Sequence, residues 1–405
     1  MRILFVTHNV PRFEGDAAGS FVLRLAVALQ AAGARVDIIA PGGAGPGAAD
    51  RIEGVSIRRV PYASPDRMTL AYSGSMAEQV MASWSGKLAL VGLLRALRRA
   101  VREQISAAAA AGDPYAVVHA HWWFPAALAL WRARWVGDPP LVVTMHGSDV
   151  RLATKVGASH GIMRAVLAQA AVRTAVSGWL ADSASRIAPA STVAVSPMPV
   201  DVRHFGAPNP APDGTPAARN GVLFVGRLNA QKGIADLLDA MAMPAMHAFA
   251  TNSGPSQAML EVVGDGPDRD ALMAKADALG ITHRVRWYGA LPQPALVPLY
   301  QGASVVAIPS REEGLGLVAV EAQLCGTPVV AYADGGLLDV VRPGHGGTLV
   351  TVGHTEALGT ALVRLLADES LARRLGALAR EEMLIRFSPA SVADRYLAHY
   401  REAAA

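Results

Sequence analysis

The sequence predicts an α/β protein that consists of two doubly wound, Rossmann-like domains. Short apolar runs alternate with segments of helical periodicity, which is typical of βαβ units with a mostly parallel sheet. This pattern occurs twice, on either side of a Pro- and Gly-rich stretch at 206–220. Hydrophobic residues make up 52% and charged residues 17% of the 405-residue chain, a balance that suits strands buried on both faces and excludes a disordered chain.

The N-terminal half begins with an apolar run, and a helical pattern that stops at Gly33 follows it. We expect strands at 3–7, 35–40, 55–60, 117–122, 141–145 and 174–177, with the first helix at 21–32. The Pro- and Gly-rich stretch is interpreted as a linker, after which strands are expected at 221–225, 260–263, 285–288, 304–308 and 328–331. The predicted domains are therefore 1–205 and 221–386, with the linker at 206–220 between them.

The C-terminal segment 387–405 is predicted to form a helix over 389–402. Its apolar side chains recur at helical spacing, at Val392, Tyr396, Leu397 and Tyr400. We expect this helix to cross back to the N-terminal domain and to bury that face there.

The most informative segment is 309–328, PSREEGLGLVAVEAQLCGTP, which directly follows a predicted strand. In doubly wound sheets, ligands bind beyond the carboxyl ends of the strands. Its glycines let backbone N–H groups approach a ligand, and the helix that follows presents its N-terminus to an anion. Glu313 in the loop and Glu321 in the helix could contact opposite ends of one extended ligand. The alternative is a loop acid and a solvated helix acid, which the apolar neighbours of Glu321 disfavour.

Two further loops follow strands of the C-terminal domain. The first, GRLNAQKG at 226–233, carries Arg227 and Lys232, which could neutralise a leaving diphosphate; the alternative is a pair of solvated surface charges. The second, GDGP at 264–267, contains Asp265 and resembles the start of a dinucleotide fingerprint whose third glycine is absent.

Histidines lie in or just after two predicted strands of the N-terminal domain. His146 lies just past the strand at 141–145, where we favour a functional role over a capping or core position. His119 and His121 are two residues apart and share a strand face. Because no third ligand stands at a recognised spacing, we expect no metal site. We expect one of the pair to be packed and His121 to face the cleft.

Together these motifs make the chain similar, over essentially its whole length, to family 4 glycosyltransferases of the GT-B fold. The motifs that carry the resemblance are HAHWWFP, VTMHGSD, PVDVRHF, GRLNAQKG, VVGDGP, EEGLGLVAVEA and TPVVAYADGG. The resemblance implies two Rossmann-like domains facing across a cleft and transfer of a sugar from a nucleotide-diphosphate sugar to an acceptor hydroxyl. It also implies retention of anomeric configuration and no obligatory cofactor or metal. A UDP-sugar is the favoured donor, with GDP- and ADP-sugars as alternatives.

The resemblance also implies roles for individual residues. Arg227 and Lys232 would hold the donor diphosphate, Glu313 the sugar hydroxyls and Glu321 the ribose, and His146 would act near the reacting centre. Further donor contacts are expected from Gly19, Asp265, Gly314, Leu315, Gly316 and Leu317, and acceptor contacts from His121 and Asp149. Two departures from the family pattern are Ala18, which precedes Gly19, and the segment GGLLD at 335–339, which replaces Gly-Gly-x-Pro-Glu.

The sequence leaves three other functions open. They are a nicotinamide-dependent oxidoreductase, a non-catalytic nucleotide-sugar sensor, and an epimerase or phosphorylase on the same fold. The oxidoreductase requires a complete glycine fingerprint, which is absent. The acceptor, which could be a glycan, a lipid-linked sugar or a small molecule, is expected to contact the loops within 61–112. The sequence reveals neither the acceptor nor the oligomeric state.

The charge and cysteine content bear on partners and location. A net charge of +4 permits an anionic ligand or membrane surface, and we expect no nucleic-acid partner. One cysteine, Cys325, fits a reducing cytoplasm, and no apolar stretch is long enough to span a membrane.

The segment 80–105 combines an apolar face (Trp84, Leu88, Val91, Leu94, Val101 and Ile105) with four arginines at 95, 98, 99 and 102. This combination is seen in interfacial helices, and we expect the segment to contribute to binding a lipid-linked or apolar acceptor at a membrane surface, with peripheral contact at its inner face. The alternative, a core-packing helix, fits the pattern better.

Overall fold

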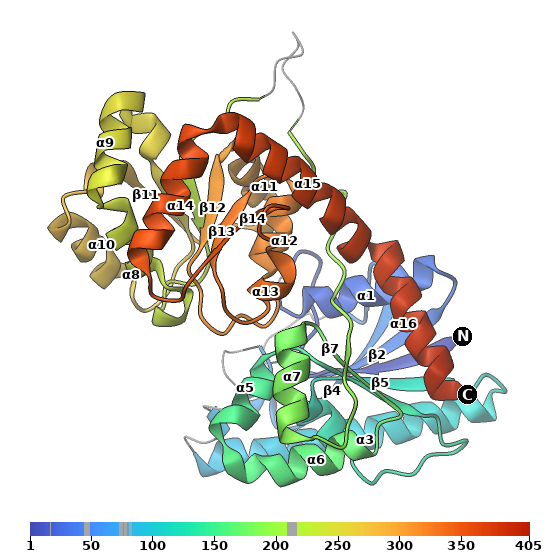
Figure 1. Ribbon diagram of the computed structural model, residues 1–405. Helices are drawn as coiled ribbons and strands as arrows, with labels where there is room; N and C mark the ends of the chain where they lie inside the picture. The colour runs from blue at the N-terminus through green and yellow to red at the C-terminus, as the bar shows by residue number, and fades with distance from the viewer. Residues whose placement is uncertain (17, 44–48, 73–75, 77–78, 81–82, 209–216) are drawn as a thin grey trace. The chain divides into compact units, whose positions relative to one another are not determined.

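The computed structural model describes the chain except for residues 17, 44–48, 73–75, 77–78, 81–82 and 209–216. The chain forms two compact units (Figure 1), of which the first consists of Met1–Pro199 and Pro389–Ala405 and the second of Val200–Ser388. The first unit therefore contains both ends of the chain. Of the linker expected at 206–220, residues 209–216 lie outside the described part of the chain.

The first unit is built on an eight-stranded sheet in the order β3-β4-β2-β1-β5-β6-β7-β8. All neighbouring strands are parallel except β3 and β4, which form an antiparallel pair. The strands are β1 (Arg2–Val6), β2 (Arg35–Pro41), β3 (Arg51–Ile52), β4 (Val55–Val60), β5 (Val117–His121), β6 (Leu141–Met145), β7 (Val172–Ala175) and β8 (Ala194–Val195).

Helices cover this sheet. They are α1 (Ser20–Ala31), α3 (Trp84–Ala110), α4 (Leu128–Leu130), α5 (Ser148–Lys155), α6 (His160–Ala168), α7 (Gly178–Ile187) and α16 (Pro389–Ala404). Helix α16 packs against α1, β5, β6 and β7, and it buries the apolar face that includes Val392, Tyr396 and Tyr400. Helix α3 packs against β2 and β4. Among the described residues, no helix is long and apolar enough to cross a membrane.

The second unit is built on a six-stranded parallel sheet in the order β11-β10-β9-β12-β13-β14. Its strands are β9 (Val222–Val225), β10 (Leu260–Val263), β11 (Val285–Gly289), β12 (Val305–Ile308), β13 (Val329–Tyr332) and β14 (Gly347–Val350). Its helices are α8 (Ile234–Met241), α9 (Pro244–Ser253), α10 (Arg269–Ala278), α11 (Gln293–Gly302), α12 (Leu317–Leu324), α13 (Leu337–Val340), α14 (Thr355–Ala367) and α15 (Glu369–Phe387). The prediction of two α/β domains with mostly parallel sheets is confirmed.

Some strands differ from the sequence-based expectation. Strand β7 ends at Ala175, because Ser177 caps α7 by accepting a hydrogen bond from the Leu180 amide, so the expected range 174–177 lies too far along the chain. The strands β3, β8 and β14 were not expected. Two of them, β3 and β8, contain only two residues each, which is too short for an alternating pattern to be visible.

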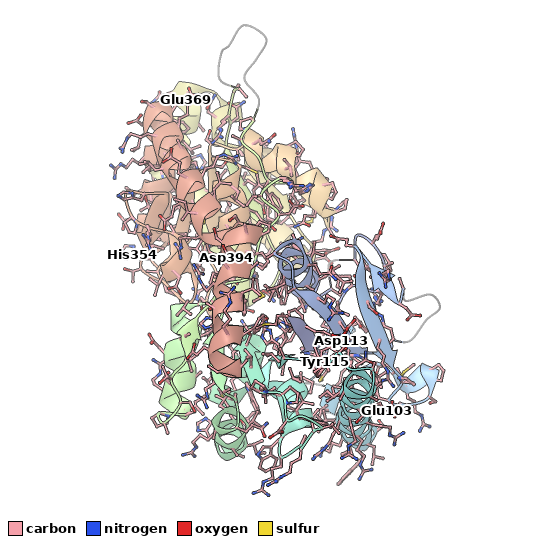
Figure 2. The ribbon with its side chains drawn as sticks, turned by 90° about the vertical axis from the view of Figure 1, so that its right-hand side faces the viewer. Glu103, Asp113, Tyr115, His354, Glu369 and Asp394 are labelled. Carbon is pink, nitrogen blue, oxygen red and sulfur yellow. The ribbon has the colours of Figure 1, made fainter. Side chains whose placement is uncertain are left out.

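The amino-terminal edge of the first sheet is held by a polar network around Arg2. Its guanidinium bonds to Asp37 at 2.9 Å and to Asp113 at 2.9 Å, and it lies 4.4 Å from the ring centre of Tyr115. The Tyr115 hydroxyl donates to Asp37 at 2.6 Å. Figure 2 shows Asp113 and Tyr115 beside each other at this edge. Since ligands of such sheets bind at the opposite, carboxyl-terminal edge, we assign this network to stability.

Candidate functional site

The loops at the carboxyl ends of β9, β12 and β13 are in direct backbone contact. The Arg311 amide donates to the Gln231 carbonyl at 2.8 Å, which joins the loop after β9 to the loop after β12. The Gly336 amide donates to the Glu313 carbonyl at 2.7 Å, which adds the loop after β13. Gly335 has a φ of 59°, and a Cβ there would lie 2.4 Å from the Glu313 carbonyl oxygen. The glycines at 335–336 are thus needed for loop packing, although the family residues after them are replaced.

Within these loops, the side chains of Lys232 and Glu313 form an ion pair. The exposed fractions of the two side chains are 24% and 15%, so the pair is partly shielded from solvent. The Lys232 amide also donates to the Asn229 side-chain oxygen at 3.2 Å, which fixes the turn that carries the lysine. The structure therefore brings together two residues that the sequence placed separately at a ligand-binding edge.

Arg227 and Asp265 lie in neighbouring loops. The guanidinium of Arg227 is exposed and makes no hydrogen bond or ion pair with the residues that the structure describes. The loops are joined by a bond from the Leu228 amide to the Asp265 carbonyl at 3.0 Å. The Asp265 carboxylate accepts from the Gly266 amide at 2.8 Å. Arg227 is thus the more available of the two charged groups.

Helix α12 begins in the loop that carries Glu313, with Gly314 and Leu315 just before it. Gly316 is its N-terminal cap, and Leu317 is its first residue. First-turn amides of a helix have no partner within the helix and attract anions. The start of α12 lies in the same set of loops as the Lys232–Glu313 pair.

Glu321 is buried within α12 and faces α11. Its carboxylate accepts hydrogen bonds from the Tyr300 hydroxyl at 3.0 Å and from the Gln293 side-chain amide at 3.1 Å. Burial, and then the neighbouring Glu321 charge, raise the pKa of Tyr300. The sequence indicated Glu321 but neither of its two partners on α11, because no local pattern reports such a contact.

In the first unit, the turn after β6 is organised by Asp149. The buried carboxylate accepts hydrogen bonds from the backbone amides of His146 at 3.2 Å, Gly147 at 3.1 Å and Trp123 at 3.0 Å. Burial raises the pKa of Asp149 to about 6, despite these hydrogen bonds. Asp149 thereby positions the His146 backbone and the start of the segment after Trp122.

The His146 side chain is hydrogen-bonded to His121, with 3.1 Å between His146 Nε2 and His121 Nδ1. His121 is fully buried, so the expectation that it faces a cleft is wrong. It lies on a central strand and packs between Phe5 and His119, with ring centres 4.7 and 4.1 Å away. Burial lowers the pKa of His121 to about 3, and burial also lowers that of His146, so both imidazoles are neutral.

His119 lies beside His121 and is itself held by two hydrogen bonds. Its Nε2 lies 2.7 Å from the Thr144 hydroxyl, and its Nδ1 lies 2.8 Å from the hydroxyl of Tyr400 on α16. Helix α16 thus contacts His119 through a hydrogen bond that the sequence did not indicate. Across the described residues, no group of three or more His, Cys, Asp or Glu side chains is placed to hold a metal ion.

Gly19 lies at the start of α1, where it is the N-terminal cap. Its φ is 64°, and a Cβ would lie 2.4 Å from the carbonyl oxygen of Asn9. This close approach is reason enough for a glycine at position 19. Ala17, in the same segment, lies outside the described residues.

Comparisons with known proteins agree with this architecture. Residues 18–204 match the family model described as Glycosyltransferase Family 4, and residues 209–382 match the model described as Glycosyl transferases group 1. The chain is 33% identical over 420 aligned positions to D-inositol 3-phosphate glycosyltransferase 1 of Catenulispora acidiphila. That alignment covers 96% of this chain and 92% of the relative.

Solved structures show the same fold. Sucrose-phosphate synthase from Thermosynechococcus elongatus superposes with a TM-score of 0.75 and 26% identity, over 99% of both chains. The Anabaena protein HepE, solved in complex with UDP, gives a TM-score of 0.69 at 20% identity and covers 99% of this chain and all of that one. These likenesses confirm that the two Rossmann-like units form a GT-B fold.

Proposed function

The chain belongs to glycosyltransferase family 4, and we propose on this premise that it transfers a sugar from a nucleotide-diphosphate donor to an acceptor hydroxyl with retention of anomeric configuration. The observation that carries the proposal is the Lys232–Glu313 pair beside the N-terminus of α12. A cation, a carboxylate and the N-terminus of a helix at one strand-end edge suit a diphosphate joined to a polyhydroxylated sugar.

In this proposal Arg227 and Lys232 bind the donor diphosphate. Negative charge grows on the diphosphate as the bond to the sugar breaks, so cations placed there stabilise the transition state more than the ground state. Lys232 exchanges part of its contact with Glu313 for the phosphate, and Glu313 then accepts hydrogen bonds from the sugar hydroxyls. The backbone of 314–317 surrounds the sugar and phosphates.

Glu321 remains the proposed ribose contact, and Gly19 and Asp265 remain proposed donor contacts. The Glu321 carboxylate accepts hydrogen bonds from Tyr300 and Gln293, so ribose hydroxyls would join or replace those bonds. UDP is the favoured nucleotide, because the fold neighbour HepE was solved with UDP. GDP and ADP are the alternatives.

His146 is the proposed substrate contact of the first unit, and its proton position follows from His121. The Nε2 atom of His121 is buried and has no hydrogen-bond partner among the described residues. A buried N–H without an acceptor is rarer than a buried acceptor without a donor. We therefore place the His121 proton on Nδ1, donated to His146 Nε2, which leaves His146 with an N–H at Nδ1. His146 would act as a neutral hydrogen-bond donor to substrate.

His121 and Asp149 are proposed to support the acceptor side through His146, since both contact it and both are buried. The acceptor remains to be identified. Because a relative at 33% identity is named for D-inositol 3-phosphate, cyclitol phosphates enter the acceptor panel beside sugars and lipid-linked sugars. The buried, unpaired Cys325 is compatible with the proposed cytoplasmic location.

The test begins with UDP-, GDP- and ADP-sugars in a thermal-shift screen, where a ligand at 100 times its dissociation constant adds about 2.7 kcal/mol of stability. The donor found is then incubated with the acceptor panel, and the anomeric configuration of the product is determined by NMR. We expect a transferred sugar with the donor's configuration. Inversion would refute retention, and donor binding without transfer to any acceptor would favour a nucleotide-sugar sensor.

A further inference from the structure

Helix α3 presents one exposed face along its length, which we call the α3 stripe. Trp84, Leu88 and Val91 lie on this face with exposed fractions of 79%, 71% and 42%. At 100° per residue, the basic residues Arg95, Arg98, Arg99 and Arg102 fall within about 60° of the same direction. The stripe therefore begins with apolar side chains and continues with arginines.

The rest of the face expected from the sequence is not exposed. Val101 and Ile105 are buried, as are Leu93 and Leu97, and α3 packs on β2 and β4. The expected apolar face was thus wrong in its second half, because those positions belong to the core. Its first half is free of the core, so the exposure of Trp84 and Leu88 needs another explanation.

The stripe is strongly basic. Helix α3 carries Lys87 and four arginines against one acid, Glu103, which gives a net charge of +4, equal to that of the whole chain. Glu103, labelled in Figure 2, is paired with Arg58 and so does little to offset these arginines. The Lys87 ammonium lies 4.7 Å from the Trp84 ring centre, so charge and apolar surface are adjacent.

A neighbouring loop extends this surface. Arg98 donates to the carbonyl of Arg132 at 3.2 Å, which joins α3 to the segment WRARWV at 131–136. Arg132, Arg134 and Val136 of that segment are exposed. The Arg132 guanidinium lies 4.9 Å from the ring centre of Trp131. This segment thus places two arginines between two tryptophans, beside the stripe.

We propose that the α3 stripe docks the first unit on an anionic lipid surface, with α3 parallel to the membrane plane. Trp84, Leu88 and Val91 enter the boundary between headgroups and acyl chains, where tryptophan is favoured. The arginines contact anionic headgroups. A nucleic acid would use the arginines but leave the apolar side chains exposed, and a second copy of the chain would bring like charges together. The inference goes beyond the proposed transferase activity and does not depend on it.

The experiment is co-sedimentation of the full chain with vesicles of phosphatidylcholine alone or mixed with phosphatidylglycerol. We expect binding only to the anionic vesicles, weakened by high salt. The double variant Trp84→Ser/Leu88→Gln and the triple variant Arg95→Gln/Arg99→Gln/Arg102→Gln should each lower vesicle affinity about tenfold or more. Thermal melting of each variant shows whether the fold is kept.

Ile385→Gln is the matched control for the apolar change, because Ile385 is 71% exposed on α15, outside the first unit. Arg374→Gln, an exposed arginine of the same helix, controls for loss of charge. Both controls should bind vesicles as the wild type does. The proposal is overturned if the wild-type chain ignores anionic vesicles, if the stripe variants bind as well as the controls, or if the stripe instead mediates RNA binding or self-association.

Discussion

Replacing Lys232 with alanine tests the proposed donor site most directly. The variant removes a cation from the diphosphate and also leaves the Glu313 carboxylate without its partner, so a negative charge then faces the donor. We expect turnover to fall by about 100-fold or more, as when one preorganised oxyanion donor is lost. Arg227 has no partner among the described residues, so Arg227→Ala leaves no carboxylate uncompensated there. It should also lower turnover by about 100-fold, but it should weaken donor binding less than Lys232→Ala does.

Stability should hardly change in Lys232→Ala. A partly exposed ion pair contributes about 0.2–1 kcal/mol, and in a domain the size of the second unit 1 kcal/mol shifts the melting temperature by roughly 2–4 °C. The matched control is Lys275→Ala, which breaks a 2.8 Å pair with Asp239 between α10 and α8, away from the strand-end loops. That control should lose a similar small amount of stability and keep its turnover.

The assay is steady-state kinetics with the identified donor, alongside thermal melting of each variant. Adding Glu313→Gln to Lys232→Ala removes the uncompensated carboxylate, so donor affinity should recover in part although turnover stays low. Near-normal turnover in both Lys232→Ala and Arg227→Ala would refute the assignment of the diphosphate site. An equal loss in Lys275→Ala would show that the effect reports general damage to the unit.

Three further results are expected. Glu321→Ala should raise the apparent Michaelis constant for the donor more than it lowers turnover. Because Glu321 is buried and hydrogen-bonded, the variant should also lose about 1–3 kcal/mol of stability. Unchanged donor kinetics would refute its proposed contact with the ribose. In ¹⁵N NMR, His146 should carry its proton on Nδ1, and His121→Phe should redistribute it; a wild-type proton on Nε2 would contradict the tautomer. On acidification from about pH 7 to about pH 5, urea unfolding should show falling stability, because His8 and His121 have folded-state pKa values of about 4 and 3 while the unfolded chain binds protons near 6.5. Each such histidine changes the free energy of unfolding by up to about 1.4 kcal/mol per pH unit. Asp149, whose pKa is raised, acts in the opposite direction, but it is a single acid. A stability profile that stays flat with pH would show that the histidines are not buried in the neutral form.

The strands were predictable where an apolar run is bounded by turn residues. For β6 and β10 the expected and observed ranges agree at both ends, because Pro140 and His146 bound the first and Gly264 follows the second. Strand β7 was misplaced because Ser177, which reads as a strand end, acts as a helix cap. Local pattern gives no means of separating those two roles.

The candidate site was predictable as a set of loops but not as a set of contacts. Lys232 and Glu313 were each indicated by their position after a strand, yet they are 81 residues apart and their pairing follows from the strand order β9-β12. His121 packs on Phe5, and its neighbour His119 is hydrogen-bonded to Tyr400 of α16; no local window contains either of these partners. Topology, rather than composition, decides these contacts.

The return of α16 to the first unit has a consequence for synthesis of the chain. On the ribosome, Val200–Ser388 emerges completely before Pro389–Ala405, so the second unit can fold while the first still lacks its last helix. Until α16 arrives, the surface of α1 that it covers stays open, and the hydrogen bond that Tyr400 makes to His119 is missing. A nascent chain stalled before Pro389 would therefore expose an apolar surface that chaperones and proteases recognise. The first unit is thus complete only after translation has passed Pro389–Ala404.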